Sequence, residues 1–289
     1  MLRARWHLPA ILRVVYATYH KLDVQNLGYC RVELEFLVRR LATVAILALA
    51  ISGVLQANSD VELTADELMA KVLDQTRGLS SYSELTMTIN RPDWKRTSSF
   101  SVWTRGREDA LIRFTAPARD AGFSTLKKGE RMWTYSPKIQ RTVRLPKSMM
   151  SQDWAGSDFS YNDLARSDDL LNEYTLRLAN VDQSDDGTIY TIEAIPKENA
   201  PVVWGKEVVV LRDDFVLLRH SYYDQEMVLV KWLETLEIDE FDGRTIPKRM
   251  RIRKSEEEDS WTEVSYEKAD FDIEIDESMF TLFALRGSE

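Results

Sequence analysis

Few residues of this chain combine the types and spacing that catalysis requires. Of its three histidines, only His220 lies beyond residue 57, and its single cysteine, Cys30, lies before that point. A serine nucleophile needs a neighbouring base, most often histidine, and structural zinc sites need cysteine and histidine ligands. His220 falls within a run typical of a strand, where a histidine more often satisfies hydrogen bonds than acts as a base. We therefore predict no catalytic residue, no metal site, no cofactor and no enzymatic activity.

Aspartates gather in one segment, which contains Asp158, Asp163, Asp168 and Asp169. Carboxylates this close in sequence could form an acid/base pair or a calcium site. The segment lacks the D-x-D-x-D-G pattern of a calcium loop. The sequence Trp-Ala-Gly-Ser-Asp at 154–158 also differs from the G-x-S-x-G of a nucleophile elbow. We favour the interpretation that these carboxylates cap short helices and solvate a loop.

The same segment carries large apolar and amphipathic side chains on an otherwise polar loop. They are Met149, Met150, Trp154, Phe159 and Tyr161. Methionine adapts its shape to irregular partners, and tryptophan and tyrosine suit a site with one wet end. Long loops in sheet proteins usually cover or bind something. The composition leaves two interpretations open: a mobile lid over an apolar groove, and a loop pinned by ordinary aromatic anchors.

The N-terminal region has the features of an export signal. Two arginines precede an uncharged apolar run at 41–55, and Ala57 follows shortly after. We predict a signal peptide at 38–57 that is cleaved near Ala57, because a membrane anchor usually needs about 20 apolar residues. Residues 1–37 are too charged for a signal peptide, and we interpret them as a non-native upstream extension. We expect residues 58–289 to form a single exported domain.

The expected domain is acidic. Residues 1–57 hold 7 of the 38 Lys and Arg and 3 of the 47 Asp and Glu, so residues 58–289 carry a net charge of −13. This charge argues against nucleic acid or an anionic membrane as the main partner. Because the domain has no cysteine, core packing alone must stabilise it, and a chain of this length can bury enough surface to do so. We expect a monomer.

A helix is expected to open the domain. Thr64 and Glu67 have the spacing of a capping box, in which the hydroxyl and the carboxylate satisfy the first free amides of a helix. Leu68, Val72 and Leu73 follow as an apolar stripe at helical spacing, and Gly78 is a typical end.

The rest of the domain predicts about a dozen strands on short loops. Residues 85–89 alternate apolar and polar side chains, and turn residues such as those at 242–244 separate the runs. The connections are too short for parallel crossovers, so we expect an antiparallel meander. Residues 249–253 alternate arginine with apolar side chains, which indicates one wet and one dry face. A sheet of this size must curl. The helix, the loop at 146–171 and the C-terminal turn at 277–280 are then the covers for its dry, concave face.

These covers are too small to fill the inside of a curled twelve-strand sheet. An incompletely filled apolar groove is typical of a site that binds a hydrophobic ligand. The in-phase apolar positions that we predict to line the groove are Met87, Ile89, Phe100, Val102, Ile112, Phe114, Trp133, Tyr135, Val208, Val210 and Trp232.

Several segments resemble the outer-membrane lipoprotein-sorting protein family, the LolA-like periplasmic carriers. The matching segments are LIRFTAPARDAGFSTL at 111–126, MWTYSPKIQRTVRLP at 132–146, GSDFSYNDL at 156–164, DGRTIPKRMRI at 242–252 and DESMFTLFAL at 276–285. The resemblance implies a mainly β fold, a half-open curved antiparallel β-barrel with helices that plug its mouth, and the composition of the loop adds a lid over the concave face. The positions that can be matched one by one to the family motif are Gly156, Asp158, Phe159, Tyr161 and Asp163. The arginine that holds the lid in better-studied carriers has no assignable counterpart.

The resemblance also implies a function. We predict a periplasmic carrier that binds acyl chains of lipoproteins or related lipids in the groove and moves them between the inner and outer membranes. An inner-membrane exporter of the ABC or RND type and an outer-membrane acceptor are the implied partners. The alternatives are an envelope sensor or interaction module that binds a membrane regulator, an enzyme that acts on lipid or glycan, and a structural protein with a filled core.

Overall fold

The computed structural model describes residues 63–165, 169–184 and 187–287. The predicted signal peptide at 38–57, the predicted upstream extension at 1–37 and Asp168 lie outside the described residues, so these interpretations stay predictions. The described part of the chain, from Leu63 onward, forms one compact unit.

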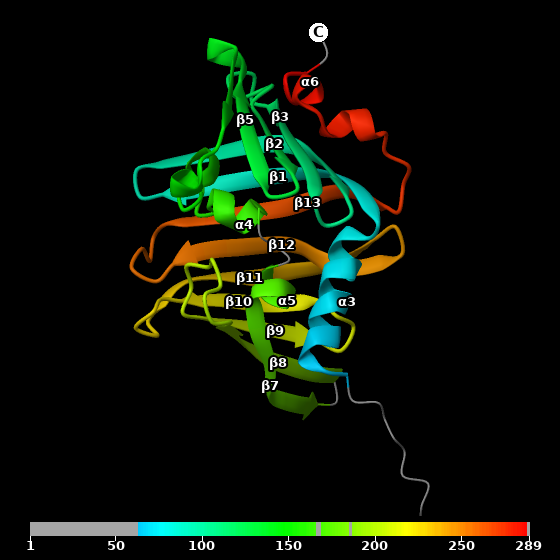
Figure 1. Ribbon diagram of the computed structural model, residues 1–289, viewed down its shortest axis with the longest axis vertical. Helices are drawn as coiled ribbons and strands as arrows, with labels where there is room; N and C mark the ends of the chain where they lie inside the picture. Colours follow the sequence, from blue (N-terminus) through cyan, green and yellow to red (C-terminus); the bar gives the residue numbers. More distant parts are fainter. Residues whose placement is uncertain (1–62, 166–168, 185–186, 288–289) are drawn as a thin grey trace, which may run out of the picture. The chain divides into compact units, whose positions relative to one another are not determined.

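Thirteen strands form one antiparallel sheet, in the order β6-β5-β4-β3-β2-β1-β13-β12-β11-β10-β9-β8-β7 (Figure 1). The strands are β1 (Ser80–Arg91), β2 (Trp94–Arg105), β3 (Asp109–Ala116), β4 (Ser124–Lys128), β5 (Arg131–Ser136), β6 (Arg141–Arg144), β7 (Tyr174–Ser184), β8 (Gly187–Pro196), β9 (Lys206–Arg212), β10 (Leu217–Tyr223), β11 (Leu229–Phe241), β12 (Arg244–Lys254) and β13 (Trp261–Phe271). The helices are α3 (Ala65–Arg77), α4 (Tyr161–Ala165), α5 (Asp169–Glu173) and α6 (Leu282–Leu285), with short 3-10 turns η1 (Pro137–Ile139), η2 (Lys147–Met149), η3 (Trp154–Gly156) and η4 (Glu277–Phe280).

The order of the strands explains the long loop. Two meanders, β1 to β6 and β7 to β13, meet where β1 pairs with β13 in the middle of the sheet. Among the described strands, β6 and β7 each have one neighbour and form the two edges. The segment that joins β6 to β7 must therefore cross from one edge to the other. It does so in front of the sheet, where Figure 1 shows α4 and α5 together with α3. The predicted half-open sheet with a helix and a loop over one face is confirmed.

Each end of the covered face has its own core. At the β7–β11 end, Leu68, Met69 and Val72 of α3 pack on Val209 and Leu211 of β9. At the β1–β3 end the core residues are Leu85, Met87, Ile89, Phe100, Ile112, Phe114, Trp154 and Val264. The C-terminal turn at 277–280 was expected on the concave face, but it lies on the opposite face of the sheet, where Phe280 and Leu285 pack on Leu111 and Leu126.

The predicted capping box of the first helix is confirmed. The Thr64 hydroxyl accepts a hydrogen bond from the backbone N–H of Glu67 at 3.2 Å, and the Glu67 carboxylate accepts one from the backbone N–H of Thr64 at 2.8 Å. Gly78 ends the helix with φ of 60°, a conformation that glycine adopts without strain. The hydrogen bond from the Thr64 backbone, with a further one from its hydroxyl, lowers the pKa of Glu67.

Replacing Thr64 with alanine is expected to lower the free energy of unfolding by about 1 kcal/mol. Urea unfolding measures this loss, and Thr115→Ala, at an exposed position outside any cap, is the control. Because the folded state lowers the pKa of Glu67, the stabilisation by its carboxylate is present above the ordinary pKa of 4.5. It is lost as the pH falls through the lowered folded-state value. Equal losses in both variants would contradict the role of the cap.

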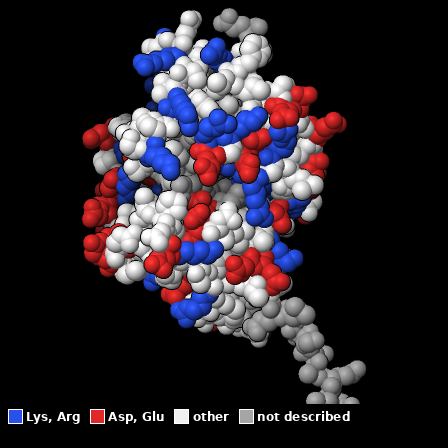
Figure 2. Space-filling model, viewed as in Figure 1, with Lys and Arg blue, Asp and Glu red and all other residues white. Residues whose placement is uncertain are grey.

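No helix among the described residues has the length and apolar character needed to cross a membrane. The face that carries α3, α4 and α5 mixes Lys and Arg with Asp and Glu (Figure 2).

Candidate functional site

The connection from β6 to β7 folds back on itself and forms what we call the lid, residues 146–165. The N–H of Trp154 donates to the carbonyl of Phe159 at 2.7 Å, and the N–H of Tyr161 donates to that of Gln152 at 3.1 Å. Gly156, with φ of 74°, follows Ala155 at the reversal. The lid is thus an ordered hairpin-like loop rather than an extended linker.

Trp154 anchors the lid to the sheet. Its side chain is 2% exposed, and its ring centroid lies 5.7 Å from that of Phe100 and 5.5 Å from that of Phe114. Its indole Nε1 donates a hydrogen bond to the Thr125 hydroxyl at 3.1 Å. Phe159, Tyr161 and Leu164 pack on the same cluster, and burial raises the pKa of the Tyr161 hydroxyl. The lid therefore fills the β1–β3 end of the concave face.

Asp158 fixes the tip of the lid to the middle of the sheet. Its carboxylate accepts two hydrogen bonds from the Arg91 guanidinium, at 3.0 and 3.1 Å, and one from the Thr262 hydroxyl at 2.6 Å. The Asp158 side chain is 1% exposed. A second arginine, Arg96, donates to the carbonyl of Ala155. Two arginines thus hold the lid, although the sequence did not identify either of them.

Asp163 fixes the other end of the lid. Its carboxylate lies 2.6 Å from the Nζ of Lys231 on β11, and both side chains are buried. The same carboxylate accepts from the backbone N–H of Ser160, and the Ser160 hydroxyl accepts from the N–H of Asp163, which together cap α4. Asp158 and Asp163 are therefore contacts between lid and sheet, and the expected capping role holds for Asp163.

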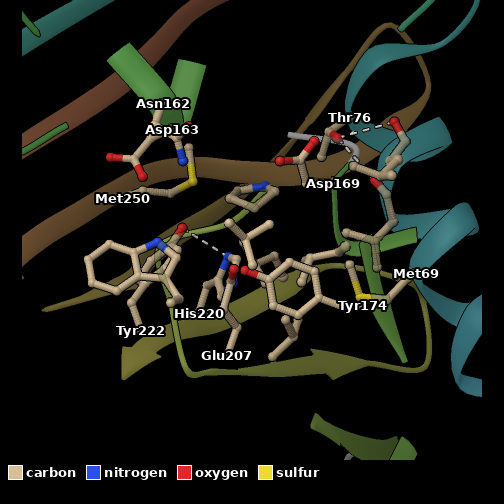
Figure 3. A pocket seen from close by; sticks show the side chains of 18 of the residues that line it. Met69, Thr76, Asn162, Asp163, Asp169, Tyr174, Glu207, His220, Tyr222 and Met250 are labelled. Carbon is tan, nitrogen blue, oxygen red and sulfur yellow. Dashed lines mark hydrogen bonds and ion pairs between the residues drawn. The ribbon is translucent and has the colours of Figure 1, made fainter. Parts of the chain in front are cut away.

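A cavity of about 280 Å³ remains at the β7–β12 end of the concave face. It lies between α3, the end of the lid and the strands beneath (Figure 3). Its apolar lining comes from Met69, Val72, Leu73, Leu170, Tyr174, Val202, Val209, Leu217, Ile246, Pro247, Met250 and Tyr266. Seven of these residues lie on strands, four lie on helices and Val202 lies in a loop. The covers of the sheet therefore leave space above it.

The polar side of this cavity is a connected network. The Nε2 of His220 lies 2.6 Å from the carboxylate of Glu207, and the Nδ1 of His220 lies 3.1 Å from the hydroxyl of Tyr222. The ammonium of Lys231 lies 5.0 Å from the centre of the Tyr222 ring and 5.3 Å from that of Trp204. Burial, and then the carboxylates of Asp163 and Glu207, raise the pKa of Tyr222 well above its ordinary value. The carboxylate of Glu207, the imidazole of His220 and the hydroxyl of Tyr222 are thus hydrogen-bonded to one another along the polar wall of the cavity.

The predicted groove residues divide into two groups. Six of them face the lid and are half or fully buried under it: Met87, Ile89, Phe100, Val102, Ile112 and Phe114. Five lie on the opposite face of the sheet, and their placement in the groove is wrong: Trp133, Tyr135, Val208, Val210 and Trp232.

The register of the strands accounts for the five exceptions. Trp133 and Tyr135 pack against the C-terminal η4–α6 segment. Val208 and Val210 alternate with Glu207, Val209 and Leu211, which are the buried residues of β9. On the outer face, the centre of the Trp232 ring lies 5.1 Å from the guanidinium carbon of Arg219 and 5.4 Å from that of Arg253. Its neighbour Lys231 is buried on the other face.

Sequence reasoning missed most of the cavity lining. The stripe Leu68, Val72 and Leu73 was visible as a helical face, and two of these three residues line the cavity. Glu207 gave no such signal, because an inward carboxylate needs a partner that sequence spacing does not reveal. The lid residues Met149 and Met150 are half-buried and lie outside the cavity lining.

Solved structures share this architecture. A DUF1329 family protein from Desulfovibrio piger matches with a TM-score of 0.69 and 27% identity, over 76% of this chain and 97% of that one. A putative outer membrane lipoprotein-sorting protein domain from Vibrio parahaemolyticus matches with a TM-score of 0.67 and 18% identity, over 77% and 98%. A LolA superfamily protein from Nitrosomonas europaea matches with a TM-score of 0.65 and 20% identity, over 77% and 99%. Comparison with curated proteins gives no match.

The open, lidded sheet has the fold of the LolA superfamily and of outer membrane lipoprotein-sorting domains, and the resemblance seen in the sequence is confirmed at this level. At residues 106–287 the chain matches the model of a family whose description reads "Uncharacterized protein", and it belongs to that family.

Proposed function

We propose that this chain is a periplasmic carrier that binds acyl chains of lipoproteins or related lipids and moves them between the inner and outer membranes. The observation that carries the proposal is the cavity of about 280 Å³ left between α3, the lid and the sheet, with walls of aliphatic and aromatic side chains. The names of the lipoprotein-sorting and LolA superfamily structures with the same fold support it. An inner-membrane exporter and an outer-membrane acceptor would be the donor and the recipient.

The cavity is small for a long acyl chain, so we propose that the lid moves when such a chain binds. Pockets for ligands of drug size span about 300–1,000 Å³, so the closed cavity lies just below that range. A longer acyl chain gains space when Trp154, Phe159 and Leu164 leave the concave face, because these side chains fill its β1–β3 end. Burial of apolar surface contributes about 2.5 kcal/mol per 100 Å². A chain that replaces the lid side chains thus exchanges one apolar contact for another, which allows uptake and release.

Native mass spectrometry of the protein purified from its own periplasm tests this proposal. Discrete adducts of lipid mass, and uptake of a fluorescent fatty-acyl probe by the stripped protein, are the expected results. A clean mass without adducts, together with no uptake of the probe, would overturn the proposal. That outcome would favour a sensor or a structural protein with the same fold.

Replacing Leu217 with tryptophan is expected to weaken binding of the fatty-acyl probe about tenfold, since the larger ring occupies space that a guest would bury. Leu217 is half-buried and lines the cavity, so the fold should tolerate the change. Titration of the probe by fluorescence measures the effect. The matched control is Leu236→Trp, because Leu236 is 37% exposed and lies away from the cavity. Equal affinities in the two variants would place the guest elsewhere.

A further inference from the structure

A second cavity, of about 170 Å³, opens at the β1–β5 end of the concave face. Its walls come from β2, from β3 and the turn that follows it, from the start of η1, and from Ala155 at the tip of the lid. This cavity shares no lining residue with the cavity under α3, although residues of the lid line both.

Three cations surround this second cavity: Arg96, Arg119 and Lys138. The one carboxylate in its lining, Asp120, lies 3.6 Å from the Nε of Arg119. Within the described part of the chain, Arg96 and Lys138 have no carboxylate within ion-pair distance. This local excess of positive charge contrasts with the net charge of −9 of the whole chain. Figure 2 shows that Lys and Arg are frequent over the half of the molecule formed by β1–β5.

One buried donor at this cavity has no partner. The Nε of Arg96 is fully buried and makes no hydrogen bond, whereas its Nη2 donates to the carbonyl of Ala155. This N–H is closed off from the cavity, so the cations that can reach a ligand there are the exposed Arg119 and Lys138. An anion held by these two cations compensates their charge, and it must lie away from Asp120, whose buried Oδ2 has no hydrogen-bond partner.

Below the cations the cavity is aromatic. Phe114 and Phe123 line it, with their ring centroids 5.6 Å apart, and Phe114 is in turn 5.5 Å from the ring of Trp154. The aromatic surface thus continues from the cationic mouth to the anchor of the lid. A ligand suited to this site has an anionic group at one end and an apolar chain at the other.

We propose that the second cavity binds the anionic head group, a carboxylate or phosphate, of an amphiphile whose chain begins on Phe123 and Phe114. The inference rests on the proposed function, because it specifies which acyl-bearing molecules the carrier takes. It also connects head-group binding to the lid, since Arg96 contacts both the cavity and the Ala155 carbonyl.

Isothermal titration at pH 8 with laurate, dodecanol and inorganic phosphate tests the inference on the full domain. Laurate and dodecanol have the same chain and differ in charge. We expect laurate to bind at least about tenfold more tightly than dodecanol, the effect of one or two charge-assisted hydrogen bonds. The double variant Arg119→Gln/Lys138→Gln should lose this preference and keep its affinity for dodecanol. Both side chains are exposed at the mouth, so the fold should not depend on them.

The control double variant Arg141→Gln/Lys147→Gln removes two exposed positive charges outside the cavity and should keep the preference. Equal binding of laurate and dodecanol to the unmodified protein, or an unchanged preference in Arg119→Gln/Lys138→Gln, would overturn the inference alone. If inorganic phosphate binds as tightly as laurate, the proposed contact of the apolar chain with Phe114 and Phe123 is overturned. Absence of binding by both laurate and dodecanol would instead overturn the proposed function.

Discussion

Replacing Trp154 with alanine is expected to open the lid and to raise amide hydrogen exchange at residues 150–161 more than about 100-fold. The indole is 2% exposed, contacts Phe100 and Phe114, and donates to Thr125. Removing a buried tryptophan side chain costs about 3–5 kcal/mol, and about 1.4 kcal/mol is a factor of ten in an equilibrium. Because the lid is a single loop across a thirteen-stranded sheet, the loss falls mainly on the closed state of the lid.

Ile195→Ala is the control. Ile195 is 43% exposed on β8 and away from the lid, so its removal should leave exchange in the lid unchanged. The opened Trp154→Ala protein should also bind the fatty-acyl probe more readily, because the β1–β3 end of the concave face becomes accessible. Slow exchange in the lid of Trp154→Ala, as in the unmodified protein, would show that the polar contacts of Asp158 and Asp163 are sufficient to hold it closed.

The sequence was enough to predict the sheet and its first helix. Alternation along β1 and β2 is clean, the turns are rich in glycine and aspartate, and the Thr64–Glu67 capping box depends on contacts only three residues apart. It also identified the lid as unusual. The reason for its length lies in the topology: β6 and β7 are opposite edges of the sheet, and the residues that join them must cross it.

The direction of side chains was predictable only where one face of a strand is polar. In β9 the run Val208-Val209-Val210 has no alternation, so its phase depends on the distant contact between Glu207 and His220. In β5 the neighbouring apolar residues Met132 and Trp133 lie on opposite faces, and Trp133 is the one that packs against the C-terminal segment.

At Lys231 and Trp232, a contact with the lid reverses the usual preference for burying tryptophan rather than lysine. A tryptophan next to a lysine in a strand is expected to be the buried residue of the two. Here Lys231 is buried because Asp163 of the lid reaches it across the concave face, and Trp232 lies outside under Arg219 and Arg253. The two members of the ion pair are 68 residues apart, which no local pattern reveals.

Replacing Lys231 with methionine is expected to lower the free energy of unfolding by about 3–5 kcal/mol, because it leaves the buried carboxylate of Asp163 without its counter-charge. The pair has an Nζ to Oδ2 distance of 2.6 Å, with side chains 6% and 9% exposed. The double variant Lys231→Met/Asp163→Asn should recover much of the loss, since it removes both charges and keeps an oxygen that can accept from the Ser160 N–H. Urea unfolding, monitored by circular dichroism, measures the free energy of unfolding of the unmodified protein, the two single variants and the double variant, which together form a double-mutant cycle.

Lys254→Met is the control for this cycle, because Lys254 also pairs with a lid aspartate, Asp153, but at 3.4 Å and with side chains 31% and 49% exposed. An exposed pair contributes about 0–1 kcal/mol, so Lys254→Met should cost far less than Lys231→Met. Equal small losses in both would mean that water reaches Lys231 in the closed protein. The lid would then be held by its aromatic anchor, and displacement of Trp154 by an acyl chain would suffice to release it.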